Sequence, residues 1–482
     1  MQQAATQLIS QPGGAEGPPG QPVATLGNTP SGLRQQLMLI AFAIVYFALI
    51  VGPVLGVLYF QTRAGHAGNF LVSLADNFAI SGFMIIVLQF VLASRTRWME
   101  SPFGMDIILR LHRVMGTLAA VLLLLHPVLL AWGRGNWGLL YKPLVPWPLE
   151  VGRLALILLL ATAIMALFRV SLRMEYQRWR SSHRILALSV IVLAFVHSLI
   201  MGVGSAARPG DLWPLPLRII WYAALPVALL AFLHRTGSVL PWLGNRNYRV
   251  QAVEAEAPGV FTVRLEPAHP GHALRHFVPG QFHFLTLQPA GREAEEHPFT
   301  ISSAPDRDGV VASTIKASGD FTKEIGALKP GTAASIRGPF GRFSCLLHPE
   351  QKNLVFIAGG VGITPFMSML RHMQRQDGGL KQRSVLLIYA NRQARDILFR
   401  KELDALAATG NVRVAYVLSR PDDQWRQERG HVNADLLRRV TAGLADPAFY
   451  ICGPPAMMAS AATALREMGV PPARIFLEEF AF

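Results

Sequence analysis

Apolar residues are unevenly distributed along this chain of 482 residues, because they are concentrated between about Leu37 and Leu233. Six apolar segments lie in this stretch, each near the length that an α-helix needs to cross a bilayer. They cover residues 37–60, 70–93, 107–132, 151–170, 185–203 and 215–233. The last segment contains Pro226, which membrane helices tolerate. The pattern predicts a six-span helical bundle over residues 34–235.

The first 33 residues are rich in Gly, Pro, Gln and Ala and contain no Lys or Arg. This composition predicts a disordered tail over residues 1–33. A secretory signal peptide needs a basic region before its apolar core, and the start of the chain lacks one. We therefore expect the first apolar segment to be a permanent membrane span.

After Trp242 the pattern changes to short alternating segments separated by Gly and Pro. Residues 248–254, 260–265 and 310–316 are predicted strands, and we expect a small β-barrel over residues 246–345. Strands at 353–357, 384–390, 412–418 and 448–452 alternate with helices such as 366–374. Such alternation is typical of a parallel, doubly wound sheet, which we expect over residues 350–482.

Basic residues favour one orientation of the spans. The loops after the second and fourth spans carry Arg95, Arg97, Arg110 and Arg113, and Arg169, Arg173, Arg178, Arg180 and Arg184. The opposite loops hold only Arg63, Arg134, Lys142 and Arg208. The positive-inside rule places the richer loops, both termini and the soluble half in the cytoplasm, and we expect a multi-pass protein of a bacterial inner membrane.

The net charge is +15, and much of the Arg excess behind it lies in the short loops between the spans, where it sets the orientation of the protein in the membrane. Zinc-type spacings and RNA-binding signatures are absent from the sequence, so we expect no nucleic-acid partner. The two cysteines, Cys345 and Cys452, imply no disulfide framework and fit a reducing compartment.

Four histidines lie in the third and fifth spans, as the pairs His112 and His126, and His183 and His197. Each pair is separated by 14 positions. Fourteen helical residues rise roughly 21 Å and make almost four turns, so both imidazoles of a pair face the same way at two depths. The predicted topology makes the two spans parallel, which pairs His112 with His183 and His126 with His197. Two stacked bis-histidine sites can hold two haems.

Other interpretations of the histidines remain. A histidine in a membrane helix can hydrogen-bond a neighbouring helix or serve in a proton relay. Two matched spacings on parallel helices favour haem ligation over both. His66 and His234 fall near span ends, where an interfacial position is expected.

The soluble half contains the run His297-Pro298-Phe299-Thr300, followed by Ser302 and Ser303. This run resembles the flavin-binding motif of the ferredoxin–NADP reductase superfamily, in the form found in NADPH oxidases and ferric reductases. The resemblance implies that this run holds the isoalloxazine and part of the phosphate chain of FAD. A turn with Gly319, Phe321 and Thr322, after a strand ending at Lys316, resembles the second pyrophosphate contact.

A second set of motifs concerns the nicotinamide nucleotide. Gly359, Gly360, Gly362, Ile363, Thr364 and Pro365 resemble the family's dinucleotide loop, and a Gly-rich turn before a helix lets backbone N–H groups approach phosphate. Cys452, Gly453, Pro454 and Met457 resemble the Cys-Gly-Pro motif beside the nicotinamide. Family members end in an aromatic ring stacked on the flavin, and either Phe480 or Phe482 matches. Ser419 and Arg420, with Arg392, resemble the 2′-phosphate site of NADPH-using relatives, so NADPH is favoured over NADH.

The spans resemble the ferric-reductase-like transmembrane domain that NADPH oxidases and ferric-chelate reductases share. The resemblance implies electron transfer from cytoplasmic NAD(P)H through FAD and two b-type haems to an acceptor on the opposite face. NADPH oxidases have a further His where this chain has Leu130, and an Arg in a part of the second span that lacks one here (70–79).

These departures make a ferric or other metal chelate the leading acceptor hypothesis, with dioxygen reduction to superoxide as the alternative. A haem relay subunit that serves a quinone or a protein partner is a further alternative. Such a subunit would need no flavin and nucleotide domains of its own, so the motifs of these domains in this chain argue against it. The same motifs argue against a non-redox proton pathway through the histidines.

Overall fold

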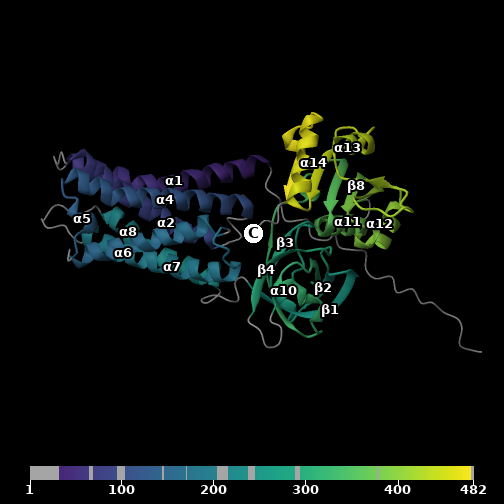
Figure 1. Cartoon of the computed structure of the whole chain (residues 1–482), viewed down its shortest axis with the longest axis horizontal. Coiled ribbons are helices and arrows are strands. Elements are labelled where there is room, and N and C mark those ends of the chain that lie inside the picture. The colour runs from purple at the N-terminus through teal and green to yellow at the C-terminus, as the bar shows by residue number, and fades with distance from the viewer. Residues whose placement is uncertain are drawn as a thin grey trace, which may run out of the picture.

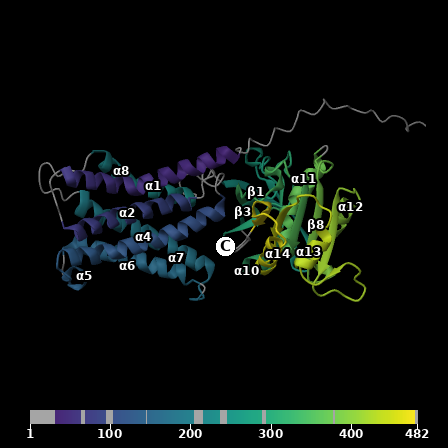
Figure 2. The same ribbon diagram turned by 90° about the horizontal axis from the view of Figure 1, so that it is seen from above.

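The computed structural model has a helical bundle at one end and two β-sheets with their helices at the other (Figure 1 and Figure 2). It describes residues 32–63, 69–94, 104–143, 146–169, 171–203, 215–236, 245–287, 294–376 and 379–478. The chain passes through the bundle first, then through an antiparallel sheet and finally through a parallel one. We call the bundle end that meets the sheets the proximal end, and the other the distal end.

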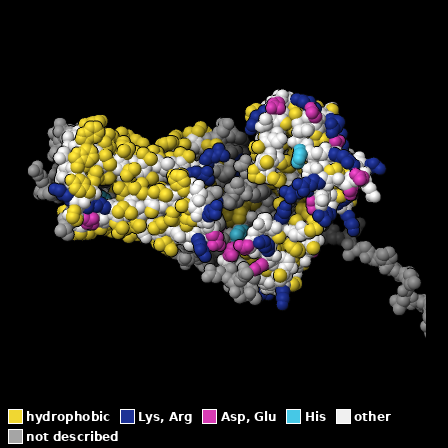
Figure 3. Space-filling model, in the orientation of Figure 1, with side chains coloured by type: hydrophobic (Ala, Val, Ile, Leu, Met, Phe, Trp, Pro, Cys, Tyr) yellow, Lys and Arg dark blue, Asp and Glu magenta, His cyan; other side chains and the backbone are white. Residues whose placement is uncertain are grey.

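Six helices of the bundle are long and apolar enough to cross a membrane. They are α1 (Gly32–Arg63), α2 (Phe70–Ala93), α4 (Met105–Gly133), α6 (Trp147–Leu167), α7 (Tyr176–Ser198) and α8 (Leu215–Thr236). Large side chains such as Ile44, Ile157 and Ile185 are more than half exposed on their outer faces. Figure 3 shows the resulting apolar belt. Because so much exposed apolar surface marks contact with lipid, the six predicted spans are confirmed, and the chain is an integral membrane protein.

Helix α7 begins nine residues before the apolar segment that predicted it. Its first turns, from Tyr176, carry Arg178 and Arg180 and extend toward the sheets. Hydropathy detects only the part of a helix that lies in lipid, whereas helical hydrogen bonding continues into polar residues. At its other end α7 continues into one turn of π-helix, Leu199–Val203, which directly follows the segment with His197.

Helix α2 is the centre of the bundle. It packs against α4, α8 and α1, and a continuous run of its second half, from Gly82 to Phe90, is buried. On the other side α6 packs against α7. The histidine-bearing helices α4 and α7 make few direct contacts with each other, which leaves space between them.

The antiparallel sheet has the strand order β4-β3-β6-β1-β2-β5. Its strands are β1 (Asn245–Ala257), β2 (Val260–Pro267), β3 (Phe282–Leu287), β4 (Glu295–Thr300), β5 (Val311–Lys316) and β6 (Ala333–Phe340). The sheet curls so that its two edge strands, β4 and β5, approach each other: the Ser302 N–H, just after β4, donates to the Ala312 carbonyl on β5 at 2.8 Å. Tyr248, Leu285 and Ile336 fill the interior. The predicted antiparallel domain is confirmed. Strands β3, β4 and β6 were not predicted, because Gly and Pro beside or within them indicate turns.

The parallel sheet has the order β10-β9-β8-β7-β11-β12. Its strands are β7 (Asn353–Gly359), β8 (Ser384–Asn391), β9 (Val412–Leu418), β10 (Glu428–Arg429), β11 (Ala448–Cys452) and β12 (Ile475–Glu478). Helices α11 (Thr364–Arg375) and α12 (Arg400–Ala407) cover one face, and α13 (Ala434–Thr441) and α14 (Pro455–Glu467) cover the other. Strands buried on both faces read as apolar runs, as predicted, and the α/β domain is confirmed.

The antiparallel domain carries one histidine in its interior. His283 on β3 is fully buried, and its Nε2 lies 2.8 Å from Ser313 Oγ. Burial lowers the pKa of His283 from 6.5 to about 3. The folded domain therefore holds a neutral imidazole at a pH where the unfolded chain would protonate it.

We expect the domain to lose stability as the pH falls from 6.5 toward 3. The unfolded chain binds a proton that the folded chain excludes, at a cost of up to ~1.4 kcal/mol per pH unit. The measurement is the melting temperature of the detergent-solubilised protein against pH. In His283→Gln, whose amide can bond Ser313 without titrating, the acid-induced fall should be shallower; curves of equal slope would contradict this assignment.

Candidate redox site

Two of the predicted flavin motifs meet in space. His297 on β4 stacks on Phe321 with ring centroids 4.1 Å apart and an interplanar angle of 25°. Its Nε2 lies 3.0 Å from Glu295 Oε2. Pro298, Phe299 and Thr300 follow on the same strand, with Thr300 buried. The fold thus brings an aromatic pair from distant sequence positions to one place on the domain surface.

The Gly319 turn is fixed by one hydroxyl. Thr322 Oγ1 accepts the backbone N–H groups of Ser318 and Gly319, both at 2.9 Å. The turn opens a single helical turn, α10 (Asp320–Lys323), and the preceding strand ends at the exposed Lys316. These two amides are therefore satisfied within the protein.

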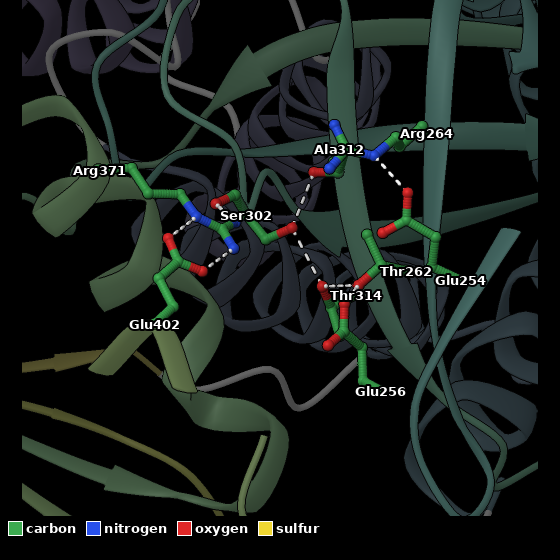
Figure 4. Close-up of polar contacts among 9 residues, drawn as sticks. All are labelled: Glu254, Glu256, Thr262, Arg264, Ser302, Ala312, Thr314, Arg371 and Glu402. Atoms are coloured by element: carbon green, nitrogen blue, oxygen red, sulfur yellow. Dashed lines mark hydrogen bonds and ion pairs between the residues drawn. The ribbon is translucent and has the colours of Figure 1, made fainter. Parts of the chain in front are cut away.

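Ser302 is held by hydrogen bonds that reach the parallel domain (Figure 4), and the neighbouring Ser303 is held from the same domain. Ser302 Oγ donates to the Ala312 carbonyl at 3.1 Å, and the Ser302 carbonyl accepts from Arg371 Nη1 at 2.8 Å. The Ser303 carbonyl accepts from Ser368 Oγ at 2.6 Å. Both donors from the parallel domain lie on α11, so the predicted flavin segment (297–303) is tied to the nucleotide domain.

Arg371 is itself held in place. It forms a bidentate pair with Glu402 of α12, at 2.7 and 2.6 Å, and its guanidinium lies 4.8 Å from the centroid of the Phe399 ring. A bidentate carboxylate contact fixes both position and orientation of a guanidinium. Arg371 therefore makes a rigid link between the domains, which the sequence motifs did not identify.

The predicted nucleotide loop and the Cys-Gly-Pro motif lie against each other. Strands β7 and β11 are parallel neighbours, so both motifs leave the sheet at the same edge. A Cβ on Gly362 would lie 2.4 Å from the Cys452 carbonyl oxygen, and one on Gly359 would lie 2.7 Å from Met457 Sδ and from Pro454 Cδ. Glycine is therefore required where the two motifs cross.

This crossing is the point where strand order reverses. The chain leaves β7 toward β8 and β9 on one side, and returns to place β11 and β12 on the other. In open α/β sheets, ligands bind at the carboxyl ends of the strands beside such a reversal. The motif residues gathered there are Gly359, Gly360, Gly362, Ile363, Thr364, Pro365 and Gly453, and helix α11 begins among them at Thr364.

The candidate 2′-phosphate residues lie on the same edge. Arg392 follows β8, and Ser419 and Arg420 follow β9. The Arg420 N–H donates to the Arg392 carbonyl at 2.9 Å, and the Ser419 N–H donates to the Asn391 carbonyl at 3.1 Å. Both arginine residues are exposed, so two guanidinium groups are available beside the nucleotide loop.

Cys452 ends β11 and is fully buried. Burial is the main cause that raises its pKa well above the usual value, and Glu478 raises it further, so the thiol is neutral. Glu478 ends β12 directly beside Cys452 in the strand register. The two candidate aromatic residues, Phe480 and Phe482, lie outside the described residues.

In the bundle, the proximal histidines face each other. His112 and His183 have ring centroids 6.4 Å apart and planes at 65°. The His183 Nδ1 atom is buried and, among the described residues, has no hydrogen-bond partner. The fold thus brings the two proximal histidines together between α4 and α7.

The distal histidines are oriented by backbone carbonyls. His126 Nδ1 lies 2.8 Å from the Ala75 carbonyl oxygen, and His197 Nδ1 lies 2.8 Å from that of Pro148. A hydrogen bond at Nδ1 leaves Nε2 available to a metal, as is usual for ligating histidines. Both rings line a cavity of about 410 Å³ between the helices.

Three charged residues line this cavity: Asp76, Arg134 and Arg153. Asp76 and Arg153 were not identified from the sequence, and Arg134 was identified only as a loop charge. Arg153 is anchored by the carbonyls of Leu139 and Lys142 at 2.7 and 2.8 Å. Charged side chains within or beside an apolar span are functional candidates, and that signal could have identified Asp76 and Arg153.

The observed architecture is that of a membrane-embedded oxidoreductase with its own cofactor-binding domains. Residues 78–194 match the family described as ferric reductase like transmembrane component. Residues 248–345 match the oxidoreductase FAD-binding domain, and residues 356–463 match the oxidoreductase NAD-binding domain. The chain belongs to the ferric reductase-like transmembrane proteins that carry a C-terminal FAD- and NAD-binding oxidoreductase module.

Similar proteins share the module. The chain is 33% identical over 204 residues to sulfhydrogenase 1 subunit gamma of Pyrococcus furiosus, over 42% of this chain and 67% of that one. It is 34% identical over 193 residues to NADH-cytochrome b5 reductase 1 of Pyricularia oryzae, over 39% and 62%. The chain thus spans about two thirds or less of the length of these relatives. The cytochrome b5 reductase domain of Ulva prolifera nitrate reductase is 22% identical, with a TM-score of 0.43, over 48% of this chain and 97% of that one.

Substituting Gly362→Ala should weaken nucleotide binding. The new Cβ would collide with the Cys452 carbonyl and push the two nucleotide motifs apart, so we expect the KM for NAD(P)H to rise about tenfold, equivalent to ~1.4 kcal/mol. Steady-state kinetics with a soluble dye as acceptor measures it. Gly271→Ala, whose Cβ would have only an ordinary contact at 3.5 Å, is the control. An unchanged KM in Gly362→Ala would disprove the role of this crossing.

Proposed function

We propose that this protein moves electrons from NAD(P)H on its proximal side, across the membrane, to an acceptor on the distal side. The observation that carries the proposal is the pair of facing rings of His112 and His183, with His126 and His197 at one cavity farther along α4 and α7, and the FAD- and NAD-binding domains at the proximal end. Met105, which begins α4, packs among aromatic residues of β3 and β6. The first histidine pair therefore lies next to the FAD-binding domain.

The donor set fits haem. Among the described residues, no group of three or more His, Cys, Asp or Glu side chains forms a metal site. A bare structural or catalytic metal needs three or four protein ligands, whereas haem needs only the axial ones. His112 and His183 would hold one haem, and His126 and His197 the other. When bound, FAD would accept a hydride and the haems would carry single electrons.

The chain's residues prepare these positions. The Ala75 and Pro148 carbonyls set the orientation of the distal rings, and a Cβ on Gly152 would lie 2.6 Å from His197 Nδ1. Any side chain at position 152 would therefore clash with the His197 ring, so glycine is required there. The positive-inside rule further supports a cytoplasmic proximal side, with both termini inside.

We favour NADPH as the donor and a ferric or other metal chelate as the acceptor. Arg392 and Arg420 are exposed beside the nucleotide loop, and a guanidinium suits a 2′-phosphate. At the distal end, Leu130 lines the cavity where NADPH oxidases have a histidine. Arg134 and Arg153 line this cavity as well, but Asp76 lies there too and Arg153 pairs with Glu150 at 3.0 Å, so the choice of a chelate rests on the departure at Leu130.

The acceptor can be tested directly. Purified protein in detergent is given NADPH, with NADH in parallel, and the formation of Fe(II) from a ferric chelate and of superoxide are followed together. We expect Fe(II) formation to account for the NADPH consumed. Cytochrome c reduction that superoxide dismutase abolishes, without turnover of the ferric chelate, would instead establish dioxygen as the acceptor.

His126→Leu should remove the distal haem and stop transmembrane transfer, while NADPH still reduces the flavin. Gly152→Ala should act in the same direction through His197, with a loss of about tenfold or more in haem content or activity. Reduced-minus-oxidised spectra give the haem content. Gly52→Ala, which meets nothing within 4 Å in α1, is the control. Full haem content in His126→Leu would contradict the ligand assignment.

A further inference from the structure

One carboxylate joins the antiparallel domain to the bundle. Glu296 on β4 contacts three guanidinium groups: Arg180 of α7 at 2.6 Å, Arg235 of α8 at 3.1 Å, and Arg337 of β6. All four side chains are only 13–16% exposed. We call these four residues the junction cluster. Arg337 Nη1 also donates to the Arg235 carbonyl at 3.2 Å, so the cluster is linked to the end of α8 as well.

The cluster lies close to the proximal histidine pair. Arg180 precedes His183 by three residues, about one helical turn. On the other helix, Met105 precedes His112 by seven residues, about two turns. Met105 packs with Phe282, Phe284 and Phe340 of the antiparallel sheet, and Arg337 lies over the Phe284 ring at 5.9 Å. Each helix that carries a proximal histidine is thus held by the FAD-binding domain.

The cluster also lies next to the predicted flavin segment. Glu296 directly precedes His297, whose ring stacks on Phe321. Successive residues of a strand point to opposite faces of the sheet. The Glu296 side chain can therefore bind the bundle while the His297 side chain lies on the other face of β4. A shift of Glu296 would therefore move β4 and His297 relative to α7.

We propose that Glu296 is a positioning residue that fixes the predicted flavin segment relative to the proximal histidine pair, and so sets the rate at which electrons enter the bundle. The inference rests on the proposed function. Electron transfer falls steeply with distance, whereas hydride transfer from the nucleotide to flavin takes place within the module. Loss of the cluster should therefore slow the first step without slowing the second.

Neutralising Glu296 removes the carboxylate that holds three nearly buried cations together. Removing one partner of a buried ion pair leaves the charges of the others uncompensated, which favours separation of the surfaces that bring them together. Glu296→Gln preserves the shape of the side chain and removes its charge. Glu296→Asp keeps the charge and should restore part of the function.

The test uses the full-length protein in detergent, mixed anaerobically with NADPH. Stopped-flow absorbance follows flavin reduction and haem reduction separately. In Glu296→Gln we expect flavin reduction to be unchanged and haem reduction to slow severalfold, because the rate of electron transfer falls steeply as the distance between donor and acceptor grows. The matched control is Glu254→Gln, since Glu254 pairs at 2.7 Å with Arg264 on the exposed surface of the same domain.

A structural readout accompanies the kinetics. Both native cysteines are buried, so spin labels can be attached selectively to Leu172→Cys near the proximal end of the bundle and to Lys329→Cys on the sheet domain, both at exposed positions. The distance distribution between the labels, measured by pulsed electron resonance, should broaden in Glu296→Gln and remain narrow in Glu254→Gln. Arg180→Gln serves as a second variant if Glu296→Gln does not fold, and should broaden the distribution in the same way.

Three outcomes would overturn the proposal. Haem reduction at the wild-type rate in Glu296→Gln would show that the cluster does not set the entry of electrons. An equal slowing of flavin reduction would assign Glu296 to the local flavin site. An unchanged label distance would show that the cluster does not hold the domains. A wild-type protein without a haem band would refute the proposed function instead, and the label distance would still decide whether the junction cluster docks the module.

Discussion

The hydrogen-bonding requirement of a backbone in lipid is the constraint on which this structure depends. A single segment that crosses hydrocarbon must satisfy its own N–H and C=O groups, and the α-helix is the form in which it can. The helical period then converts sequence spacing into depth, so that 14 residues return a side chain to the same face almost four turns on. Four imidazoles on two helices consequently lie as two pairs, one at each depth.

The features that could be predicted from the sequence are those that leave a local signal in it. Spans, strands and glycine motifs are local signals, and the six spans, the antiparallel domain and the parallel sheet were all anticipated from them. The facing of His112 and His183 was anticipated as well, because the helical period and the parallel topology decide it. The assignment of haem and flavin ligands stays a prediction.

Features that depend on contacts between distant residues could not be predicted. The polar start of α7 precedes the apolar segment 185–203 from which the helix was predicted, and Arg180 contacts Glu296 there at 2.6 Å. Asp76 was one charge in an apolar helix, and its position at the distal cavity appears only when α2, α4 and α6 are assembled. Strand β6 contains Gly338 and Pro339, which indicate a turn locally, although pairing with β1 and β3 makes this segment a strand.

The contacts at the two ends of the predicted flavin segment suggest why the module works as one unit. Next to its first residue, Glu296 binds arginines of α7 and α8; at its end, the carbonyls of Ser302 and Ser303 accept from Arg371 and Ser368 of α11. An eight-residue stretch, 296–303, is thus fixed to the bundle on one side and to the nucleotide domain on the other. Because polar contacts with charged donors are shorter and more directional than apolar ones, they define position rather than mere association. The distance for the proposed hydride transfer on one side of the flavin and that for the proposed electron transfer on the other would therefore both depend on this short segment.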